Sequence, residues 1–331
     1  MAVTPNRIWL SGDLNQAESR IVAWKAPIPR LRQWYSEGRD VHSMVGARIT
    51  RVIQATPGIV MPMRADRSGE MFKCVPPDAF SKSTAPEERD ITKRTVHGSN
   101  YDMMIDKLAL VLSVPYETAK IIYTIYHGLF PEIKRDYHGW CRAQLMQHKC
   151  IITPEPVRFR KVFHGVNSYQ PIDSDTLRSA YSCYPQCTVG FILARVLNRA
   201  CTVFVRSMSN GAGRAAVWSP VDELKDVWAM WYGLENWDTF RRNLARQRSD
   251  PMTILWRGMD VRMDVHDSVN VSTPDDSFVL QWAGAQLREA AEIQLRISDD
   301  PEWGTMTTPM DFKIGPNLLD MVDFKMEAAL A

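Results

Sequence analysis

The sequence lacks several features that would assign a class of protein directly. Its 40 basic and 38 acidic residues nearly cancel, so the global charge does not indicate nucleic-acid binding. Its six cysteines form no Cys-x-x-Cys pair, the usual signature of a structural zinc site. No run of 18 apolar residues occurs, so we expect no membrane span. What remains is a globular composition, with 45% hydrophobic and 24% charged residues.

Two further absences concern the cysteines and the cellular compartment. Cys183 and Cys187 lie one helical turn apart, but no second pair matches them, so we interpret them as buried thiols rather than metal ligands. The polar residues 1–5 show no signal-peptide pattern. We therefore expect a cytoplasmic protein with reduced thiols.

Four functional side chains recur every four residues in the middle of the chain: Arg89, Lys93, His97 and Tyr101. A helix turns about 100° per residue, so these positions lie along one helical face. Arg89 can grip phosphate oxygens with two hydrogen bonds and Lys93 adds a compact charge, which together suit a polyphosphate. The two rings further along could stack on a base. The alternative interpretation is a solvated, charged helix face.

Two carboxylates are predicted at the ends of strands. Residues 7–13 predict a short strand ending at Asp13, before helical periodicity over 16–24; taken alone, Asp13 would be interpreted as a helix cap. Residues 262–272 predict a hairpin with Asp267 at its tip. Carboxylates on neighbouring strands suit magnesium, and with a phosphate-binding helix they suggest two-metal phosphoryl transfer.

Five segments resemble, in the correct order, the motifs of family A DNA polymerases, the bacterial polymerase I class. Residues 13–20, Asp-Leu-Asn-Gln-Ala-Glu-Ser-Arg, resemble motif A, and residues 38–42 resemble the Gly-x-Asp-Ile-His that follows it. Residues 89–101 resemble motif B, with a histidine in the Phe slot as in phage members. The remaining two of the five are 178–186, which resembles Arg-x3-Asn-x-Pro-Met-Gln, and 266–268, which resembles motif C. Two longer stretches are also similar to the family: 115–164 to the fingers and 310–320 to the closing strand.

The resemblance implies a DNA-templated DNA polymerase that adds dNTPs to a primer 3′-hydroxyl. Two magnesium ions would be held by Asp13, Asp267 and the backbone carbonyl of Leu14. Residues implied to bind the nucleotide are Gln16, Glu18, His42, Arg89, Lys93, His97 and Tyr101. Lys93 would also protonate the leaving pyrophosphate, and Glu18 would exclude a ribose 2′-hydroxyl. Residues implied to contact primer-template DNA are Arg178, Ser182, Gln186 and His266.

Three residues depart from the family pattern and keep other readings open. His97 replaces an aromatic residue, Asp102 replaces a glycine after Tyr101, and Ser268 replaces the motif C glutamate. His-Asp-Ser is also the form found in single-subunit phage RNA polymerases, so an enzyme of that kind is one alternative. A DNA-binding assembly subunit with low activity is the other. His42, read alone, would be an N-terminal helix residue with no ligand.

The resemblance also implies the fold and its organisation. We expect an α+β right-hand polymerase architecture, with an antiparallel palm sheet backed by helices (1–22 and 166–331) and helical fingers (23–165). Segments 51–86 and 206–252 exceed the family's spacing. The first is interpreted as a loop insertion; the second contains four tryptophans, interpreted as a buried helical subdomain or, alternatively, a docking surface.

The expected architecture has no thumb or exonuclease, which in the family precede motif A. We therefore expect a second polypeptide to supply them, with an excised fragment as the alternative. If a phage encodes the chain, it would act in the cytoplasm of the bacterial host.

Overall fold

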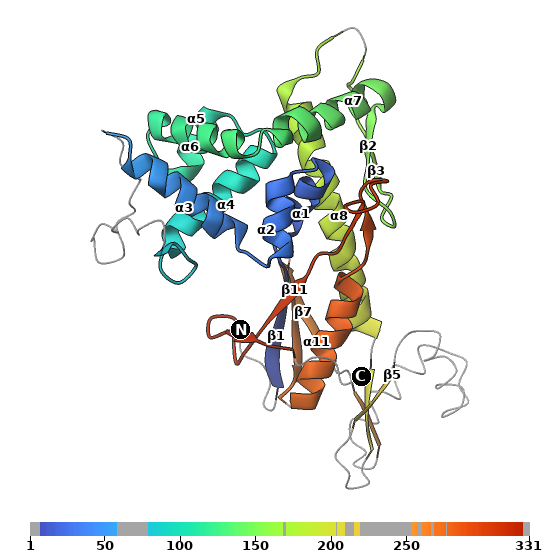
Figure 1. Cartoon of the computed structure of the whole chain (residues 1–331). Coiled ribbons are helices and arrows are strands. Elements are labelled where there is room, and N and C mark those ends of the chain that lie inside the picture. The colour runs from blue at the N-terminus through green and yellow to red at the C-terminus, as the bar shows by residue number, and fades with distance from the viewer. Residues whose placement is uncertain are drawn as a thin grey trace. The chain divides into compact units, whose positions relative to one another are not determined.

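The structure is a computed structural model (Figure 1). It describes residues 7–57, 79–167, 170–202, 204–208, 215–218, 253–256, 260–265, 268–275 and 277–326. The chain forms two compact units. The first comprises Met1–Asn15, Val189–Ile293 and Thr307–Ala331, and the second comprises Gln16–Thr188 and Gln294–Met306.

The first unit is built on a five-stranded antiparallel sheet with the order β12-β11-β1-β8-β7. The strands are β1 (Arg7–Leu14), β7 (Asp260–Val265), β8 (Ser268–Pro274), β11 (Met310–Gly315) and β12 (Val322–Phe324). β1 is central, because it pairs with β8 on one side and β11 on the other. The antiparallel pairing of β7 with β8 confirms the predicted hairpin, and β1 confirms the predicted strand that carries Asp13.

Alternating side chains give this sheet a buried face and an exposed face. Leu10 and Leu14 are fully buried, and the cross-strand neighbours of β1 on that face include the buried Phe312 and Val269. Helix α11 (Ser277–Ala291) contacts β1, β8 and β11 and buries Leu280, Ala283 and Leu287, which recur at helical spacing. Asp13 and Asp311 lie on the other face and are exposed.

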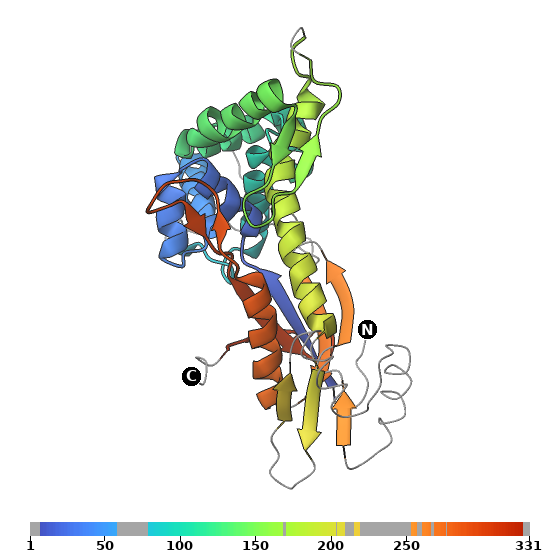
Figure 2. The ribbon, with the colours of Figure 1, turned by 90° about the vertical axis from the view of Figure 1, so that its right-hand side faces the viewer.

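A second, three-stranded antiparallel sheet of order β5-β4-β6 lies at the predicted insertion 206–252: β4 overlaps its start, β5 lies within it, and β6 follows its end (Figure 2). Its strands are β4 (Phe204–Met208), β5 (Ala215–Trp218) and β6 (Thr253–Trp256). The described part of this segment is therefore β-structure, whereas a helical subdomain was predicted for 206–252. Ala215–Trp218 is an apolar run that ends in valine and tryptophan, which are both common in strands. Trp228, Trp231 and Trp237 lie outside the described residues.

The second unit is mainly helical. Its helices are α1 (Ala17–Lys25), α2 (Pro29–Ser36), α3 (Val41–Gln54), α4 (Pro86–Asn100), α5 (Ile105–Leu112), α6 (Tyr116–Leu129), the π-helix η2 (Ile133–His138), α7 (Gly139–His148) and the first half of α8 (Ser174–Thr202). The four-residue periodicity over 89–101 correctly predicted α4, although the helix starts earlier, at Pro86, because proline suits the first helical turn. Of the predicted loop insertion, residues 58–78 lie outside the described residues.

Buried polar contacts hold the C-terminal end of α4 in place. The hydroxyl of Tyr126 on α6 donates to Asn100 Oδ1 at 2.8 Å, and His138 Nε2 lies 2.8 Å from the carbonyl oxygen of Asn100. His138 is fully buried and stacks on Tyr181 of α8, with ring centroids 4.0 Å apart. Because α4 is bonded to both α6 and η2 at this end, its functional face has a fixed orientation within the unit.

Residues 294–306 lie between two segments of the first unit in the sequence, but they belong to the second unit. They form the hairpin β9 (Leu295–Arg296) and β10 (Thr305–Met306), and the hairpin β2 (Cys150–Ile152) and β3 (Arg160–Val162) belongs to the same unit. Trp24 on α1 donates its indole N–H to the carbonyl of Thr305 at 3.2 Å and packs edge-on against Trp303. The hydrophobic pattern of residues 294–306 does not predict that they belong to the second unit.

The unit boundaries differ from the domain boundaries expected from the sequence. The expected palm included residues 16–22 and 166–188, which lie in the second unit. Aromatic packing explains the difference for α8: Tyr181 stacks on His138, and Tyr184 packs edge-on against Trp140 of α7 at 5.0 Å. The assignment of the units as palm and fingers stays a prediction.

Within the described ranges, no single helix has the length and apolar composition to cross a membrane. Helices α5 and α6 meet that criterion only when taken together, and the chain bends by 109° between them.

Candidate active site

The exposed face of the first unit's sheet carries Asp13 in the middle of a cross-strand row. In register, Asp13 lies opposite Asp311 of β11 and opposite Ser268 of β8. Directly opposite residues in an antiparallel pair point to the same face, so these three side chains share one side of the sheet. Asn15 donates its side-chain N–H to Asp311 Oδ2 at 2.6 Å. The row therefore places side-chain oxygen atoms that could bind a metal ion near the end of β1.

His266 and Asp267, the predicted DNA contact and second metal ligand, lie outside the described residues. Their neighbours Val265 and Ser268 pair with each other across the hairpin. Among the residues that the structure does describe, no group of three or more His, Cys, Asp or Glu side chains is placed to hold a metal ion. The predicted two-aspartate site therefore stays a prediction. Leu14, whose carbonyl was predicted as a further ligand, buries its side chain on the opposite face from Asp13.

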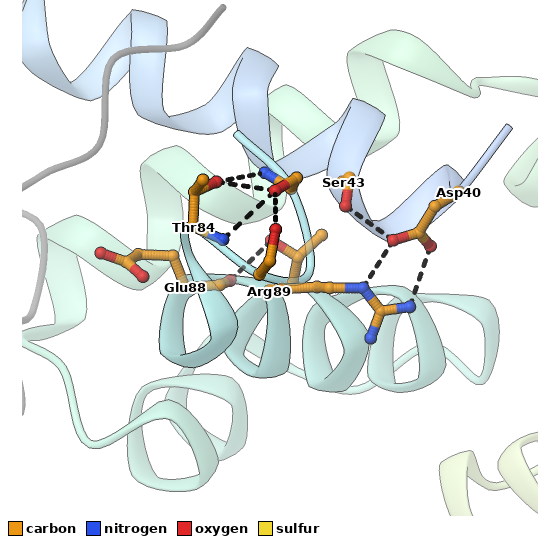
Figure 3. Close-up of polar contacts among 8 residues, drawn as sticks. Asp40, Ser43, Thr84, Glu88 and Arg89 are labelled. Carbon is orange, nitrogen blue, oxygen red and sulfur yellow. Dashed lines mark hydrogen bonds and ion pairs between the residues drawn. The ribbon is translucent and has the colours of Figure 1, made fainter. Parts of the chain in front are cut away.

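In the second unit, Arg89 of α4 is held by a carboxylate that sequence analysis did not assign (Figure 3). Its Nε and Nη2 donate to the two oxygens of Asp40 at 2.5 and 3.0 Å, and Ser43 donates to the same carboxylate at 2.6 Å. Burial alone would raise the pKa of Asp40, but the hydrogen bonds from Arg89 and Ser43 and the charge of Arg89 lower it. Asp40 lies within the Gly38–His42 block, so the signal was present in a segment where only His42 was given a role.

Lys93 follows Arg89 by one turn on the same face of α4. Its side chain is exposed, and it makes no ion pair with any residue in the described part of the chain. Arg89 uses two of its five N–H donors on Asp40, so others remain for a ligand. The predicted phosphate clamp is thus an oriented arginine beside an exposed ammonium.

Glu18, His97 and Tyr101 meet in one cluster, as their assignment to a single nucleotide site requires. The Tyr101 hydroxyl donates to Glu18 Oε2, and His97 Nδ1 lies 3.6 Å from the same oxygen. Burial and the neighbouring Glu18 carboxylate raise the pKa of Tyr101 well above its usual value, so the phenol stays protonated and can donate. The carboxylate of Glu18 is therefore fixed from α4, although Glu18 belongs to α1. Gln16, the residue before α1, has a left-handed backbone with φ 51°.

His42 is the second residue of α3. It is 3% exposed, its Nδ1 has no hydrogen-bond partner among the described residues, and its ring stacks at 6.2 Å from that of His97. Burial, with the positive charges of Arg89 and Lys93 nearby, lowers the pKa of His42 to about 3, although Asp40 opposes the shift. His42 is therefore neutral at physiological pH. The predicted role of His42 in nucleotide binding stays a prediction.

The turn after α4 keeps its bend without glycine. Asp102 adopts a left-handed conformation, with φ 58°, which aspartate tolerates better than most residues. Lys134 Nζ lies 3.5 Å from the Asp102 carboxylate and holds it in place. Asp102 therefore makes this turn without a glycine and adds a carboxylate to it.

The predicted DNA contacts of α8 lie beside α4 and α5. Within the second unit, a cavity of about 470 Å³ is lined by side chains that include Arg94, His97, Tyr101, Lys107, Arg178 and Ser182. Arg178 bonds Asp175 at 2.5 Å and Ser174 at 3.2 Å, while Ser182 donates to the Ser179 carbonyl at 3.3 Å. Gln186 is exposed one turn further along. The cavity thus brings two predicted DNA contacts together with two predicted nucleotide contacts.

Sequence reasoning missed Arg94 and Lys107, which add two cations to this cavity. Arg94 pairs with Asp90 at 2.5 Å and donates to the Val111 carbonyl at 3.2 Å. It lies one residue beyond Lys93, off the four-residue stripe, and no local pattern marks it. Asp311 was missed as well, because only the register of β11 with β1 places it opposite Asp13.

Comparison with known proteins bears on the fold. No family model and no curated protein matches the chain. Among solved structures it is similar to the POL domain of Pol1 from M. smegmatis in complex with DNA primer-template and dNTP, with a TM-score of 0.57 and 15% identity. The match covers 95% of this chain and 41% of that chain.

At this identity the likeness shows the fold alone. The chain therefore has the fold of a polymerase I-type POL domain, with mixed helices and an antiparallel sheet. This confirms the predicted α+β fold class. The predicted absence of a thumb stays a prediction.

The buried neutral His42 predicts a specific pH dependence of stability. Its folded-state pKa of about 3 lies below the value of about 6.5 for an unfolded histidine. Between these values the unfolded chain binds a proton that the folded chain does not. His42 therefore makes the free energy of unfolding fall as the pH decreases, by roughly 1.4 kcal/mol per pH unit.

His42→Gln should reduce the slope of unfolding free energy against pH by about this amount between about pH 5.5 and 4. Denaturant titrations at several pH values measure the slope, with the exposed His164→Gln as the control. An unchanged slope in His42→Gln would contradict the buried, neutral assignment.

Proposed function

We propose that this chain is a DNA-templated DNA polymerase core that adds dNTPs to a primer 3′-hydroxyl by two-metal phosphoryl transfer. The observation that carries the proposal is the register that sets Asp13 opposite Ser268, because Ser268 directly follows Asp267 in the sequence. Two-metal chemistry needs two carboxylates on neighbouring strands with open positions for substrate oxygens. The likeness to a polymerase fold supports this reading.

The donor set at the end of β1 fits magnesium. Asp13 and Asp311 offer exposed carboxylates on one face of the sheet, and like charges placed opposite each other favour a cation between them. We assign metal binding to Asp13, Asp267 and the carbonyl of Leu14, with Asp311 as an adjacent acidic group. Bound magnesium would activate the 3′-hydroxyl and neutralise charge on the leaving phosphates.

The face of α4 would bind the triphosphate. Lys93 is exposed and Arg89 is already oriented by Asp40, so ordering the clamp costs little side-chain entropy when the ligand binds. Lys93 would also hold the proton that passes to pyrophosphate. His42, neutral and with a buried unpartnered nitrogen, would contact the triphosphate, and the His97 ring would stack on the incoming nucleotide.

Glu18 would select the sugar. Tyr101 fixes its carboxylate through a hydrogen bond, so Glu18 cannot rotate away without leaving the buried phenol unpaired. A rigid carboxylate at this point would exclude a 2′-hydroxyl. Gln16, which precedes α1, would help to orient the same nucleotide.

The cationic cavity beside α8 would accept the template strand. Arg178, Ser182 and Gln186, with the newly recognised Arg94 and Lys107, present donors suited to phosphates and base edges. His266 would lie near the primer terminus. The M. smegmatis POL domain binds primer-template DNA and a dNTP, and we assign the same partners to this chain.

The two alternative functions can be distinguished from a DNA polymerase by which nucleotides the chain incorporates. Ser268 after Asp267 favours a single-subunit RNA polymerase, while the Glu18–Tyr101 bond favours deoxynucleotides. A DNA-binding assembly subunit would bind DNA and incorporate neither nucleotide. A thumb-bearing and exonuclease-bearing partner polypeptide, and a phage origin with action in the host cytoplasm, stay predictions.

Primer extension with magnesium tests the proposal. The wild type should incorporate dNTPs, and Asp13→Asn and Asp267→Asn should each reduce the rate by roughly a thousandfold or more, because metal stabilisation of transition-state charge contributes several kcal/mol. Asp323→Asn, an exposed carboxylate on β12 of the same sheet, is the control and should keep the wild-type rate. Absence of dNTP incorporation by the wild type, even with a thumb-bearing polymerase fragment added, would sink the proposal.

Sugar selection is tested by Glu18→Ala. Removing the carboxylate should improve the ratio of ribonucleotide to deoxynucleotide incorporation on the order of tenfold or more, since a lost steric contact has about that effect on discrimination. Tyr101→Phe, which keeps Glu18 but removes its hydrogen bond, should give a smaller change. Glu117→Ala on α6 is the control. Unchanged selectivity in Glu18→Ala would remove the sugar-gate assignment.

A further inference from the structure

The second unit contains another cavity, of about 430 Å³, that the proposed polymerase chemistry does not use. Its walls come from α1, α7 and α8 (Lys25, Trp140, Tyr184), from the turn after β2 (Thr153–Arg158), and from residues 296–299. Tyr184 lies two residues beyond Ser182, which lines the cationic cavity, and two residues turn a helix by about 200°. The two cavities therefore open on opposite sides of α8.

Lys25 is the distinctive group in this second cavity. Its ammonium lies 4.0 Å from the ring centroid of Trp140 and 5.5 Å from that of Tyr184. In the part of the chain that the structure describes, it makes no hydrogen bond and no ion pair. Burial lowers the pKa of Lys25, which reflects the cost of keeping this charge away from water. The rings compensate only part of that cost.

The other charges in the cavity are paired. Arg158 bonds Glu155 at 3.1 Å, and Arg296 bonds Asp299 at 2.6 Å. Both pairs are exposed, so each contributes little stability, and their arginines can turn to a new anion at small cost. Lys25 thus leaves one unbalanced positive charge in a cavity that two guanidinium groups also line.

We propose that this cavity binds a phosphate group, with Lys25 as its principal ion-pair partner and Arg158 and Arg296 as secondary donors. Phosphate has the charge to balance Lys25 and the oxygen geometry that guanidinium groups recognise. The cavity exceeds the size of inorganic phosphate, so the natural ligand is a phosphate ester, either a free nucleotide or a nucleic-acid backbone. The inference does not rest on the proposed polymerase activity.

Calorimetric titration of the full chain with inorganic phosphate, at ionic strength matched with chloride, tests the site. Lys25→Met should weaken phosphate affinity roughly tenfold or more, because charge-assisted hydrogen bonds contribute ~1.5–3 kcal/mol. Lys120→Met on α6 should leave this affinity unchanged. No binding to the wild type beyond the chloride control, or equal affinity in Lys25→Met, would overturn the proposal.

A second measurement needs no variant. Acetylation of the wild-type chain by an N-hydroxysuccinimide ester, read by mass spectrometry, should show Lys25 protected by phosphate and the exposed Lys120 unprotected. Equal labelling of Lys25 with and without phosphate would also overturn the proposal. A short single-stranded oligonucleotide distinguishes the two sources: protection of Lys25 by the oligonucleotide as well as by phosphate assigns the nucleic-acid backbone, and protection by phosphate alone assigns a free phosphate ester.

Discussion

The pairing of β1 with both β8 and β11 is the constraint on which the first unit depends. Because strand side chains alternate, this register buries Leu10 and Leu14 under α11 and exposes Asp13. A slip of one residue would expose the leucines and bury the aspartate, which costs several kcal/mol on both counts. The hydrophobic core and the acidic row are thus consequences of one register. A change of register at this strand would therefore alter both stability and the candidate chemistry.

In the second unit, polar contacts fix the orientation of α4. Asn100 is bonded by Tyr126 and His138 at the end of the helix, and Asp40 holds Arg89 near its start. These contacts come from three other segments of the unit, so rotation of the helix would break several hydrogen bonds, of which those to Asn100 are buried. The exposed Lys93 between them is then presented in a defined direction.

Local patterns were enough to predict the elements that carry the candidate site. Short runs of strand-like residues identified β1 and the β7–β8 hairpin, and four-residue spacing identified α4, because each signal is local in the sequence. The Arg89–Asp40 pair joins residues 49 apart, and the Asp13–Asp311 pairing joins opposite ends of the chain, so neither has a local signature. Likewise, nothing in residues 294–306 indicates that they pack against Trp24. The sequence therefore predicts which side chains are chemically suited to a site. The packing of the folded chain determines which of them come into contact.

The central claim is that the exposed sheet face at Asp13 binds the divalent metal ions of a nucleotidyl-transfer reaction. The most direct measurement is an anomalous difference map from crystals grown with manganese, a dNTP and primer-template DNA. We predict a manganese peak about 2.1 Å from the Asp13 carboxylate, as for a magnesium-type site. Manganese bound elsewhere, with no contact to Asp13, would contradict the account.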